Sequence, residues 1–455
     1  MLVIISDVHL GDGTTAESIP PSAFNLFAER LRETAYFASW RADGSYRPIE
    51  NINLVLMGDI LDPLHSTRWL DTVPGDANYI RPWSDPNQPG YAAKLREVTQ
   101  AIFDENKEAI DVLRRCADGK VATVPPATRG GKPDRKTKER IPLKVRAHYM
   151  VGNHDWFYRL PGQAFDQIRQ ELIDALGLHN PSTNFPHAME ELPPLKNIFE
   201  SYKVYGRHGD CFDTFNYDRE KGRNHGTLGD VFTMEVLNRF PVEVQKRFGE
   251  DLPSGIVDSL RRLTNIRPVL ATPLWISGQI KNYAGSAALE DDLKKVWDDI
   301  CDEFLQNDFV READKAFKLD IVDAMELIVK ISKRASFNTI NEVVSWLHDI
   351  LGGGEQSFAS HALREPAFLN DSARYIVYGH THHHEIIPLD EDMKPPHSDS
   401  QVYFNSGTWH TYYALAIKNP MEQKFVPYKA LTYLMFYTGD EREGRHFETW
   451  SGAYA

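Results

Sequence analysis

Short apolar runs, each ending on a turn-forming or polar residue, recur along the 455-residue chain. Runs of this kind are typical of buried β-strands. We therefore predict strands at Leu2–Ser6, Ile52–Met57, Val145–Val151, Tyr202–Gly206, Tyr375–Tyr378 and Val402–Phe404. The closing region has no convincing helical periodicity, and we expect further strands at Tyr412–Ile417 and Lys429–Tyr437.

Two stretches with apolar residues at helical spacing separate the first three predicted strands. One is Ala23–Trp40, with Phe24, Phe27, Leu31 and Ala35, and the other is Ala92–Cys116, with Leu95, Val98, Ile102, Ala109 and Leu113. Residues at this spacing share one face of a helix. Because strands alternate with helices, the pattern predicts an α/β fold.

The pattern changes between about Thr214 and Asn370, where strand signals stop and helical spacing dominates. The repeating apolar positions are Phe232, Val236 and Phe240; Leu289, Leu293, Trp297, Ile300 and Phe304; Ile321, Met325 and Ile328; and Val344, Leu347 and Leu351, before Gly352–Gly354. A segment of roughly 155 residues is long enough to fold as a domain of its own. We therefore predict a helical insertion at 214–370.

Composition narrows the partners and the compartment. The net charge is −14, from 51 basic and 65 acidic residues, so no overall field attracts long nucleic acid. Cys116, Cys211 and Cys301 are few and widely spaced, which indicates a reducing compartment. We recognise no signal peptide and no apolar stretch of membrane-spanning length, and we expect a cytoplasmic protein.

One segment, Gly130–Lys144, is strongly basic and bounded by Pro and Gly. We interpret it as a solvated surface loop. The alternative is a patch that meets phosphate or a lipid surface, which leaves peripheral membrane contact open.

Residues of metal-ligand type follow several of the predicted strands. These motifs are Asp7-Val8-His9, Gly58-Asp59, Gly152-Asn153-His154-Asp155, Gly206-Arg207-His208-Gly209-Asp210 and Gly379-His380-Thr381-His382, with Asp62 and Asn405–His410 as flanks. Carboxylate, imidazole and amide groups at successive strand ends gather along one rim of a sheet, and no Cys joins them to make a thiolate zinc site. The order of motifs predicts a metal centre.

Together the motifs resemble the calcineurin-like metallophosphoesterase superfamily over residues 1–213 and 371–410. The resemblance implies a sandwich of two mixed β-sheets flanked by helices. It also implies two divalent metal ions, which we expect to be Mn, with Fe or Zn as alternatives. One metal would be held by Asp7, His9, Asp59 and His382, and the other by Asp59 as a bridge, Asn153, His208 and His380.

The resemblance further implies that His154 faces the phosphate, as a proton donor or a stabiliser of charge, and that Asp155 orients it. The remaining nearby histidines, His65, His148, His383 and His384, have no motif role, and we expect them at the rim or behind the ligands.

The insertion begins and ends beside two ligand motifs, so we predict that 214–370 is a cap over the centre and that 1–213 and 371–455 form the catalytic domain. We expect its underside and the loops around His65, Arg68 and Trp156–Arg159 to enclose a substrate pocket. The alternative is a helical addition that faces away.

Two stretches, His208–Asp213 and Ser406–Thr411, look like those of the UDP-2,3-diacylglucosamine pyrophosphatase branch. Two departures are His154, where that branch usually has Arg, and a much longer cap. We therefore expect a hydrolase of phosphoanhydride or phosphodiester bonds in a small, nucleotide-linked or amphipathic molecule. Alternatives are a nuclease or cyclic-nucleotide phosphodiesterase, a phosphomonoesterase or phosphoprotein phosphatase, and a non-catalytic scaffold.

Overall fold

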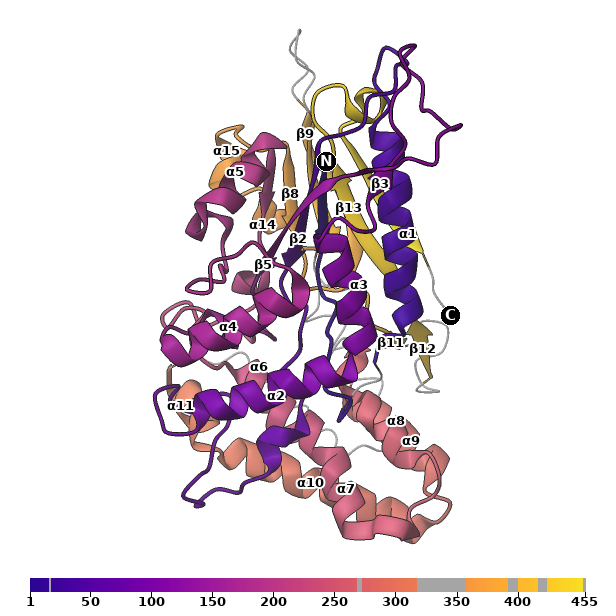
Figure 1. Ribbon diagram of the computed structural model, residues 1–455. Coiled ribbons are helices and arrows are strands. Elements are labelled where there is room, and N and C mark those ends of the chain that lie inside the picture. The colour runs from indigo at the N-terminus through magenta and orange to yellow at the C-terminus, as the bar shows by residue number, and fades with distance from the viewer. Residues whose placement is uncertain (16–17, 268–271, 317–356, 392–399, 416–423, 453–455) are drawn as a thin grey trace.

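The computed structural model describes residues 1–15, 18–267, 272–316, 357–391, 400–415 and 424–452 (Figure 1). Its largest sheet has five strands in the order β14-β13-β1-β2-β5. The neighbouring strands β1, β2 and β5 are parallel, whereas β13 runs antiparallel to both β1 and β14. The strands are β1 Leu2–Ile5, β2 Asn51–Met57, β5 Lys144–Met150, β13 Leu431–Phe436 and β14 Phe447–Gly452.

A second sheet of four strands has the order β6-β8-β10-β9. Strands β6, β8 and β10 are parallel, and β9 pairs antiparallel with β10. Their bounds are β6 Val204–Gly206, β8 Tyr375–Tyr378, β9 His384–Glu391 and β10 Ser400–Ser406. Both sheets are therefore mixed, and in both the parallel strands end on the same rim.

An apolar core fills the space between the two sheets. Leu2, Ile4 and Val55 of the first sheet belong to one buried cluster with the second sheet. Ring contacts continue it, since Phe404 lies 5.6 Å and Tyr375 5.2 Å from Phe436. The structure is mixed α/β as predicted, while the specific metallophosphoesterase sandwich stays a prediction.

Helices cover the outer faces of this pair of sheets (Figure 1). The odd-numbered residues of β1 pack with the helices α1 Pro21–Ala38, α2 Tyr91–Glu105, α3 Lys107–Ala117 and α4 Gln163–Leu176. The helices α5 Pro193–Ser201, α14 Ala359–Ala362 and α15 Pro366–Leu369 lie on the side of the second sheet. The two sheets therefore lie between helical layers, and the strand ends at the rim lie inside this arrangement.

The single helix predicted at Ala92–Cys116 is in fact two. Asn106 separates α2 from α3, with φ −106° and ψ 25°. Its side-chain Nδ2 donates to the carbonyl oxygen of Gly11 at 2.7 Å and to that of Ile102 at 2.8 Å. The hydrogen bond to Gly11 ties the break to the loop that follows β1.

The described part of the insertion is mostly helical and has its own apolar cluster, which includes Val236, Phe240, Trp297 and Ile300. The helices that surround this cluster are α6 Leu228–Phe232, the π-helix η5 Thr233–Asn238, α7 Arg239–Phe248, α8 Ile256–Arg261, α9 Thr272–Tyr283, α10 Ala287–Gln306 and α11 Asp308–Ala316. The helices α14 and α15 also fall within the predicted range 214–370, but they pack with the second sheet instead. The repeats predicted at Ile321–Ile328 and Val344–Leu351, with Gly352–Gly354, lie outside the described residues.

One strand of the insertion was not expected. β7, Ile266–Arg267, pairs in parallel with β11, Tyr412–Leu415, and β12, Phe425–Tyr428, completes this three-stranded sheet. The insertion is therefore joined by backbone hydrogen bonds to the segment that follows His410.

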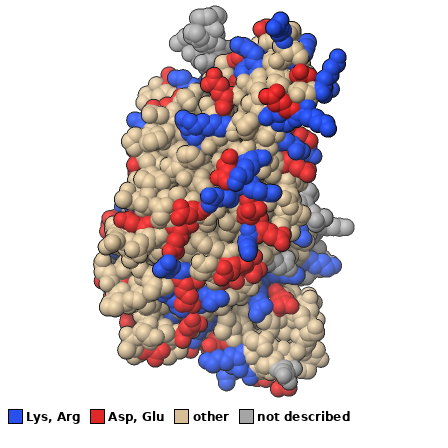
Figure 2. Space-filling model, viewed as in Figure 1, with Lys and Arg blue, Asp and Glu red and all other residues tan. Residues whose placement is uncertain are grey.

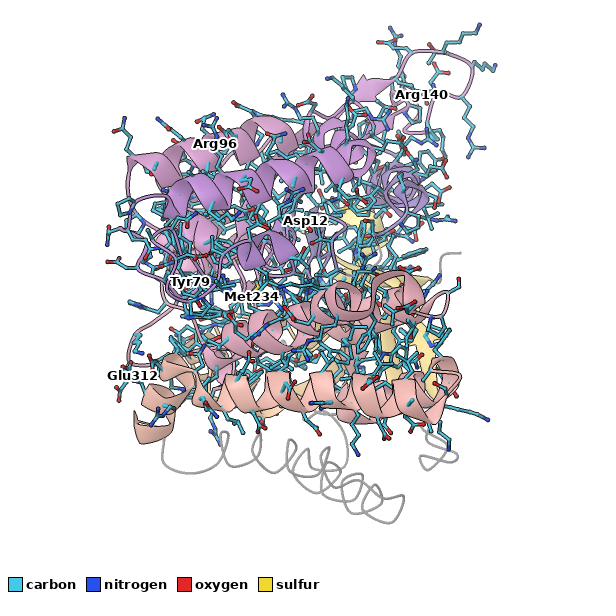
Figure 3. All side chains as sticks on the ribbon, turned by 90° about the horizontal axis from the view of Figure 1, so that it is seen from below. Asp12, Tyr79, Arg96, Arg140, Met234 and Glu312 are labelled. Carbon is cyan, nitrogen blue, oxygen red and sulfur yellow. The ribbon has the colours of Figure 1, made fainter. Side chains whose placement is uncertain are left out.

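Side chains also fasten the insertion to the α/β part. Met234 of η5 is buried in the apolar cluster that joins β1 to the helices α1–α4, and Asn238 donates to the carbonyl oxygen of Leu64 at 3.0 Å. Arg81 and Glu235 form a buried ion pair with 2.8 Å between Nε and Oε1. Figure 3 shows Met234 and Tyr79 near this boundary, between the insertion helices and the rest of the molecule.

The basic segment Gly130–Lys144 contains the two-residue strand β4 Ile141–Pro142, paired with β3 Thr123–Val124. Arg140 and most of its charged neighbours are exposed, at a corner of the molecule (Figure 3). On the face in Figure 2, acidic and basic side chains are interspersed. Among the described helices, none combines the length and apolar character needed to cross a membrane.

Candidate metal centre

The predicted ligands leave the ends of parallel strands and meet at one rim. Asp7 and His9 follow β1, Asp59 follows β2, and Asn153 follows β5 in the first sheet. In the second sheet, His208 follows β6, and His380 and His382 follow β8. The first group consists of Asp7, His9 and His382, whose ligand atoms lie within 4.8 Å of one another. His9 Nε2 is 3.0 Å from His382 Nε2, and His382 Nε2 is 3.4 Å from Asp7 Oδ1.

A second group contains Asp59, His208 and His380, again with ligand atoms within 4.8 Å. Asn153 lies among them, because its Oδ1 is 3.1 Å from His208 Nε2 and 2.8 Å from His380 Nδ1. The amide oxygen and both imidazoles thus face one point. The structure brings together the four residues proposed for the second metal.

Asp59 connects the two groups. Its Oδ2 lies 3.1 Å from His208 Nε2 and 3.9 Å from His9 Nε2. The side chain is 1% exposed. A carboxylate whose Oδ2 faces both ligand groups is in a position to bridge two cations.

The ligand imidazoles are oriented by contacts on their other nitrogens. His208 Nδ1 donates to the carbonyl oxygen of Met57 at 3.2 Å, and His9 Nδ1 faces Asp62 Oδ2 at 2.8 Å. His380 Nε2 faces Asp213 Oδ2 at 3.0 Å. Such outer contacts fix the tautomer and direct the remaining lone pair toward a metal.

The backbone at the ligands is held in an uncommon conformation. Nine non-glycine residues of the described chain have positive φ, and five of these are Asp7, His9, Asp59, His380 and His382. Left-handed backbone at non-glycine residues costs energy and is concentrated at functional sites. The fold holds these side chains at the rim in spite of that cost.

Neighbouring glycines leave no space for a side chain at the centre. A Cβ on Gly152 would lie 2.3 Å from Asp59 Oδ1, and one on Gly58 would lie 2.5 Å from His208 Nδ1. On Gly379 it would lie 2.5 Å from Asp7 Oδ2. The tight approach of backbone to ligand atoms, together with the oxygen and imidazole donors, fits divalent cations such as Mn, Fe or Zn.

Charge is concentrated at this buried rim. Burial raises the pKa of Asp7, and the neighbouring Asp59 adds to the effect. Burial opposes a charge on His208, but Asp59 and Asp7 raise its pKa to about 10. Burial also opposes the charge of Asp59, yet His208 and His154 hold its pKa below the ordinary value. Buried His and Asp groups that could hold metal ions are therefore present.

His154 lies beside the two groups, but its carboxylate partner differs from the one we expected. His154 Nδ1 is 3.1 Å from Asp62 Oδ1, and its backbone N–H donates to Asp59 Oδ1 at 2.8 Å. Asp155 instead accepts from Tyr149 Oη at 2.5 Å and from the backbone N–H groups of Gly152 at 2.6 Å and Ile60 at 3.0 Å. Burial and Asp59 raise the pKa of Asp155 to about 7. The carboxylate beside the His154 ring is therefore that of Asp62, and not that of Asp155 as we expected.

Other residues around the centre had weak or absent sequence signals. Asp62 was only a motif flank, and Asp213 lies in the stretch that follows His208. Asn265 had no signal, because it belongs to the insertion. Its Oδ1 lies 2.8 Å from His410 Nε2, and the ring of His410 is 5.8 Å from that of His9. Only the pairing of β7 with β11 places it there.

The four histidines without motif roles have other partners. His65 Nδ1 lies 2.8 Å from Asp62 Oδ2, and His384 Nδ1 lies 2.9 Å from the carbonyl oxygen of Asn405. The rings of His383 and Tyr412 are 5.5 Å apart, and those of His148 and His179 are 6.0 Å apart.

No protein-family model, curated protein or solved structure matches the chain. The function is therefore inferred from the geometry of the site and the order of the motifs.

Proposed function

We propose that the protein is a metal-dependent hydrolase of phosphoanhydride or phosphodiester bonds in small molecules. The observation that supports this most is the position of Asp59, whose Oδ2 lies between His208 Nε2 at 3.1 Å and His9 Nε2 at 3.9 Å. One buried carboxylate shared by two convergent ligand groups is the arrangement that a dinuclear centre requires.

Two divalent ions, for which we propose Mn, would lower the pKa of bound water and stabilise the charge that develops on phosphoryl oxygens. Asp7, His9, Asp59 and His382 would hold one ion, and Asp59, Asn153, His208 and His380 the other. Asp213 and Asp62 keep the outer nitrogens of His380 and His9 engaged, so that the opposite nitrogen of each ring faces the ion.

We assign proton transfer to the leaving oxygen to His154. Asp62 faces Nδ1 and favours a proton there, so Nε2 is the nitrogen assigned to exchange a proton with the leaving oxygen. The side chain is 13% exposed, which leaves it accessible at the mouth of the rim. The backbone hydrogen bond to Asp59 fixes its distance from the ligand groups.

A small substrate fits the charge and the insertion. The chain carries a net charge of −14, whereas long nucleic acid is bound through clustered Lys and Arg. Asn265 of the insertion reaches His410 beside His9, which supports a role of the insertion in selecting the part of the substrate that is not hydrolysed.

The test is a panel of substrates on protein loaded with Mn²⁺, with metal content measured on the same sample. The panel contains nucleotide-linked pyrophosphates, cyclic nucleotides, single-stranded DNA and phosphomonoesters. We expect two metals per chain and turnover of a pyrophosphate or small diester. Protein that holds two metals and hydrolyses none of these would contradict the proposal, as would a preference for single-stranded DNA.

A further inference from the structure

Three imidazoles surround one carboxylate at the edge of the candidate centre. Asp62 Oδ2 lies 2.8 Å from His9 Nδ1 and 2.8 Å from His65 Nδ1, and its Oδ1 lies 3.1 Å from His154 Nδ1. The rings of His65 and His154 are 4.8 Å apart. The four ligand-type atoms all lie within 4.8 Å of one another.

Only part of this cluster belongs to the proposed dinuclear centre. His9 turns Nε2 toward His382 and Asp7, so its Nδ1 serves only to orient the ring. Asp62, His65 and His154 present three further ligand atoms, on the side of His9 away from Asp7. A carboxylate with two imidazoles is a common set for zinc, which takes three protein ligands and leaves a fourth position for water.

The cluster can be reached from solvent. The side chains of His65 and His154 are 10% and 13% exposed, while Asp62 is 1% exposed. A cation that enters from solvent would therefore contact the two imidazoles first, and the buried carboxylate of Asp62 lies behind them. Each neutral imidazole would move its single proton from Nδ1 to Nε2, so that the Nδ1 lone pair is free to bind the metal.

We propose that Asp62, His65 and His154 form a third metal site, selective for Zn²⁺, that inhibits the enzyme when it is filled. Zinc on Nδ1 of His154 would replace the hydrogen bond to Asp62 that orients the ring, and would fix the ring against Asp62 and His65. A ring fixed there is no longer positioned to serve the leaving oxygen. The inhibitory consequence depends on the proposed function, whereas the site itself does not.

The site is tested directly by crystals of the Mn²⁺-loaded protein soaked in Zn²⁺, with anomalous data on both sides of the zinc absorption edge. We expect a zinc peak within bonding distance of Asp62, His65 Nδ1 and His154 Nδ1, in addition to the metals of the two ligand groups. Zinc found only at those two groups would overturn the proposal. This measurement uses the unmodified chain, so it is unaffected by any folding defect of a variant.

Inhibition of enzyme activity by zinc is the second test of the site. In a Zn²⁺ titration of the Mn²⁺-loaded enzyme, His65→Asn should raise the half-inhibiting zinc concentration at least about tenfold, relative to its own uninhibited rate. The control His383→Asn changes a rim histidine outside the cluster and should leave that concentration unchanged. Equal inhibition of His65→Asn and the unmodified enzyme would reject the site. If no sample hydrolyses any phosphate compound, the proposed function fails, and the zinc peak still decides the site.

Discussion

A single carboxylate, that of Asp62, orients histidines that serve different purposes. It holds His9, a proposed metal ligand, and His154, the proposed proton donor, each through Nδ1. The sequence suggested Asp155 as the carboxylate that orients His154, because the two residues are adjacent in the chain. Adjacent residues leaving a strand diverge, however, and the loop after the neighbouring β2 brings Asp62 to the ring instead.

His154→Asn should reduce turnover by about 10²–10⁴-fold, the range for a lost proton-transfer group. Metal content should remain two per chain, because His154 is in neither ligand group of the centre. Steady-state kinetics and metal analysis on the same preparation check both parts. Loss of one metal from the folded variant would make His154 a ligand of the centre and refute the assignment.

Asp62→Asn and Asp155→Asn should separate the two candidate partners. Asp62→Asn weakens the orientation of His9 and His154, and we expect a ~10–100-fold loss in metal affinity or turnover. Asp155→Asn disturbs the buried hydrogen bonds to Tyr149, Gly152 and Ile60, so its main effect should be a lower melting temperature. Turnover and thermal unfolding of both variants are measured side by side. A larger kinetic loss in Asp155→Asn would restore the partner that sequence favoured.

At the scale of elements, the turn after β5 contains the proposed ligand Asn153 and, next to it, Gly152, where no space is left for a side chain. Gly152→Ala places a methyl group 2.3 Å from Asp59 Oδ1 without removing any ligand. We expect metal affinity and turnover to fall by at least about tenfold, because the shared carboxylate must move. Equilibrium dialysis with Mn²⁺ measures the change.

Gly130→Ala is the matched control, since its added methyl meets only Thr128 Oγ1 at 3.9 Å. It should alter neither metal binding nor stability by more than about 0.5 kcal/mol. Unchanged metal affinity in Gly152→Ala would mean that the turn is more compliant than its packing indicates.

Strand β5 also carries a buried histidine that should make stability depend on pH. Burial lowers the pKa of His148 to about 4 from 6.5, and its Nδ1 has no hydrogen-bond partner among the described residues. The unfolded chain therefore takes up a proton below pH 6.5 that the folded chain refuses until about pH 4. Stability is lost as pH falls through this window and is unaffected above it.

By linkage, the loss attributable to His148 is about 2 kcal/mol at pH 5. Urea unfolding of the unmodified chain and of His148→Gln at pH 7 and pH 5 isolates it. The unmodified chain should lose about 2 kcal/mol more than the variant between the two pH values. Parallel pH profiles for the two proteins would exclude His148 as the cause.

The elements that sequence predicted well are those buried on both faces. β1, β2 and β8 read as largely apolar runs because nearly all of their residues are buried, whereas the edge strand β5 is buried throughout only from Ala147 onward. β9 and β14 lie at sheet edges, their described side chains are partly or fully exposed, and both strands were missed. The break at Asn106 depends on a hydrogen bond to Gly11, and β7 depends on its partner β11, so neither has a local signal.

On the scale of the whole molecule, the buried pair of Arg81 and Glu235 fastens the insertion beside the rim. Arg81→Met removes the closer of the two cations at the buried Glu235 carboxylate and leaves Arg239 Nη1 at 3.4 Å, so the cost should stay below the ~3–5 kcal/mol of a fully broken buried pair. We expect faster hydrogen exchange and protease cleavage in η5 and α7, with the first sheet unchanged.

Asp299→Asn is the control for Arg81→Met. It breaks the exposed pair between Arg247 and Asp299 within the insertion, where both side chains are more than a third exposed. Its cost should stay below about 1 kcal/mol. If Arg81→Met exchanges no faster than this control, apolar contacts such as those of Met234 hold the insertion in place.

The position of β1 has a consequence for the order in which the chain is made. β1 is the central strand of its sheet, yet the partner on one side, β13, is Leu431–Phe436. While the ribosome is still translating the middle of the chain, the apolar run Leu2–Ile5 can pair with β2 but has an open edge on the other side. Open apolar edges recruit other strands, and nascent chains in this state are prone to aggregate. β1 therefore keeps an open edge until residues 431–436 have been made.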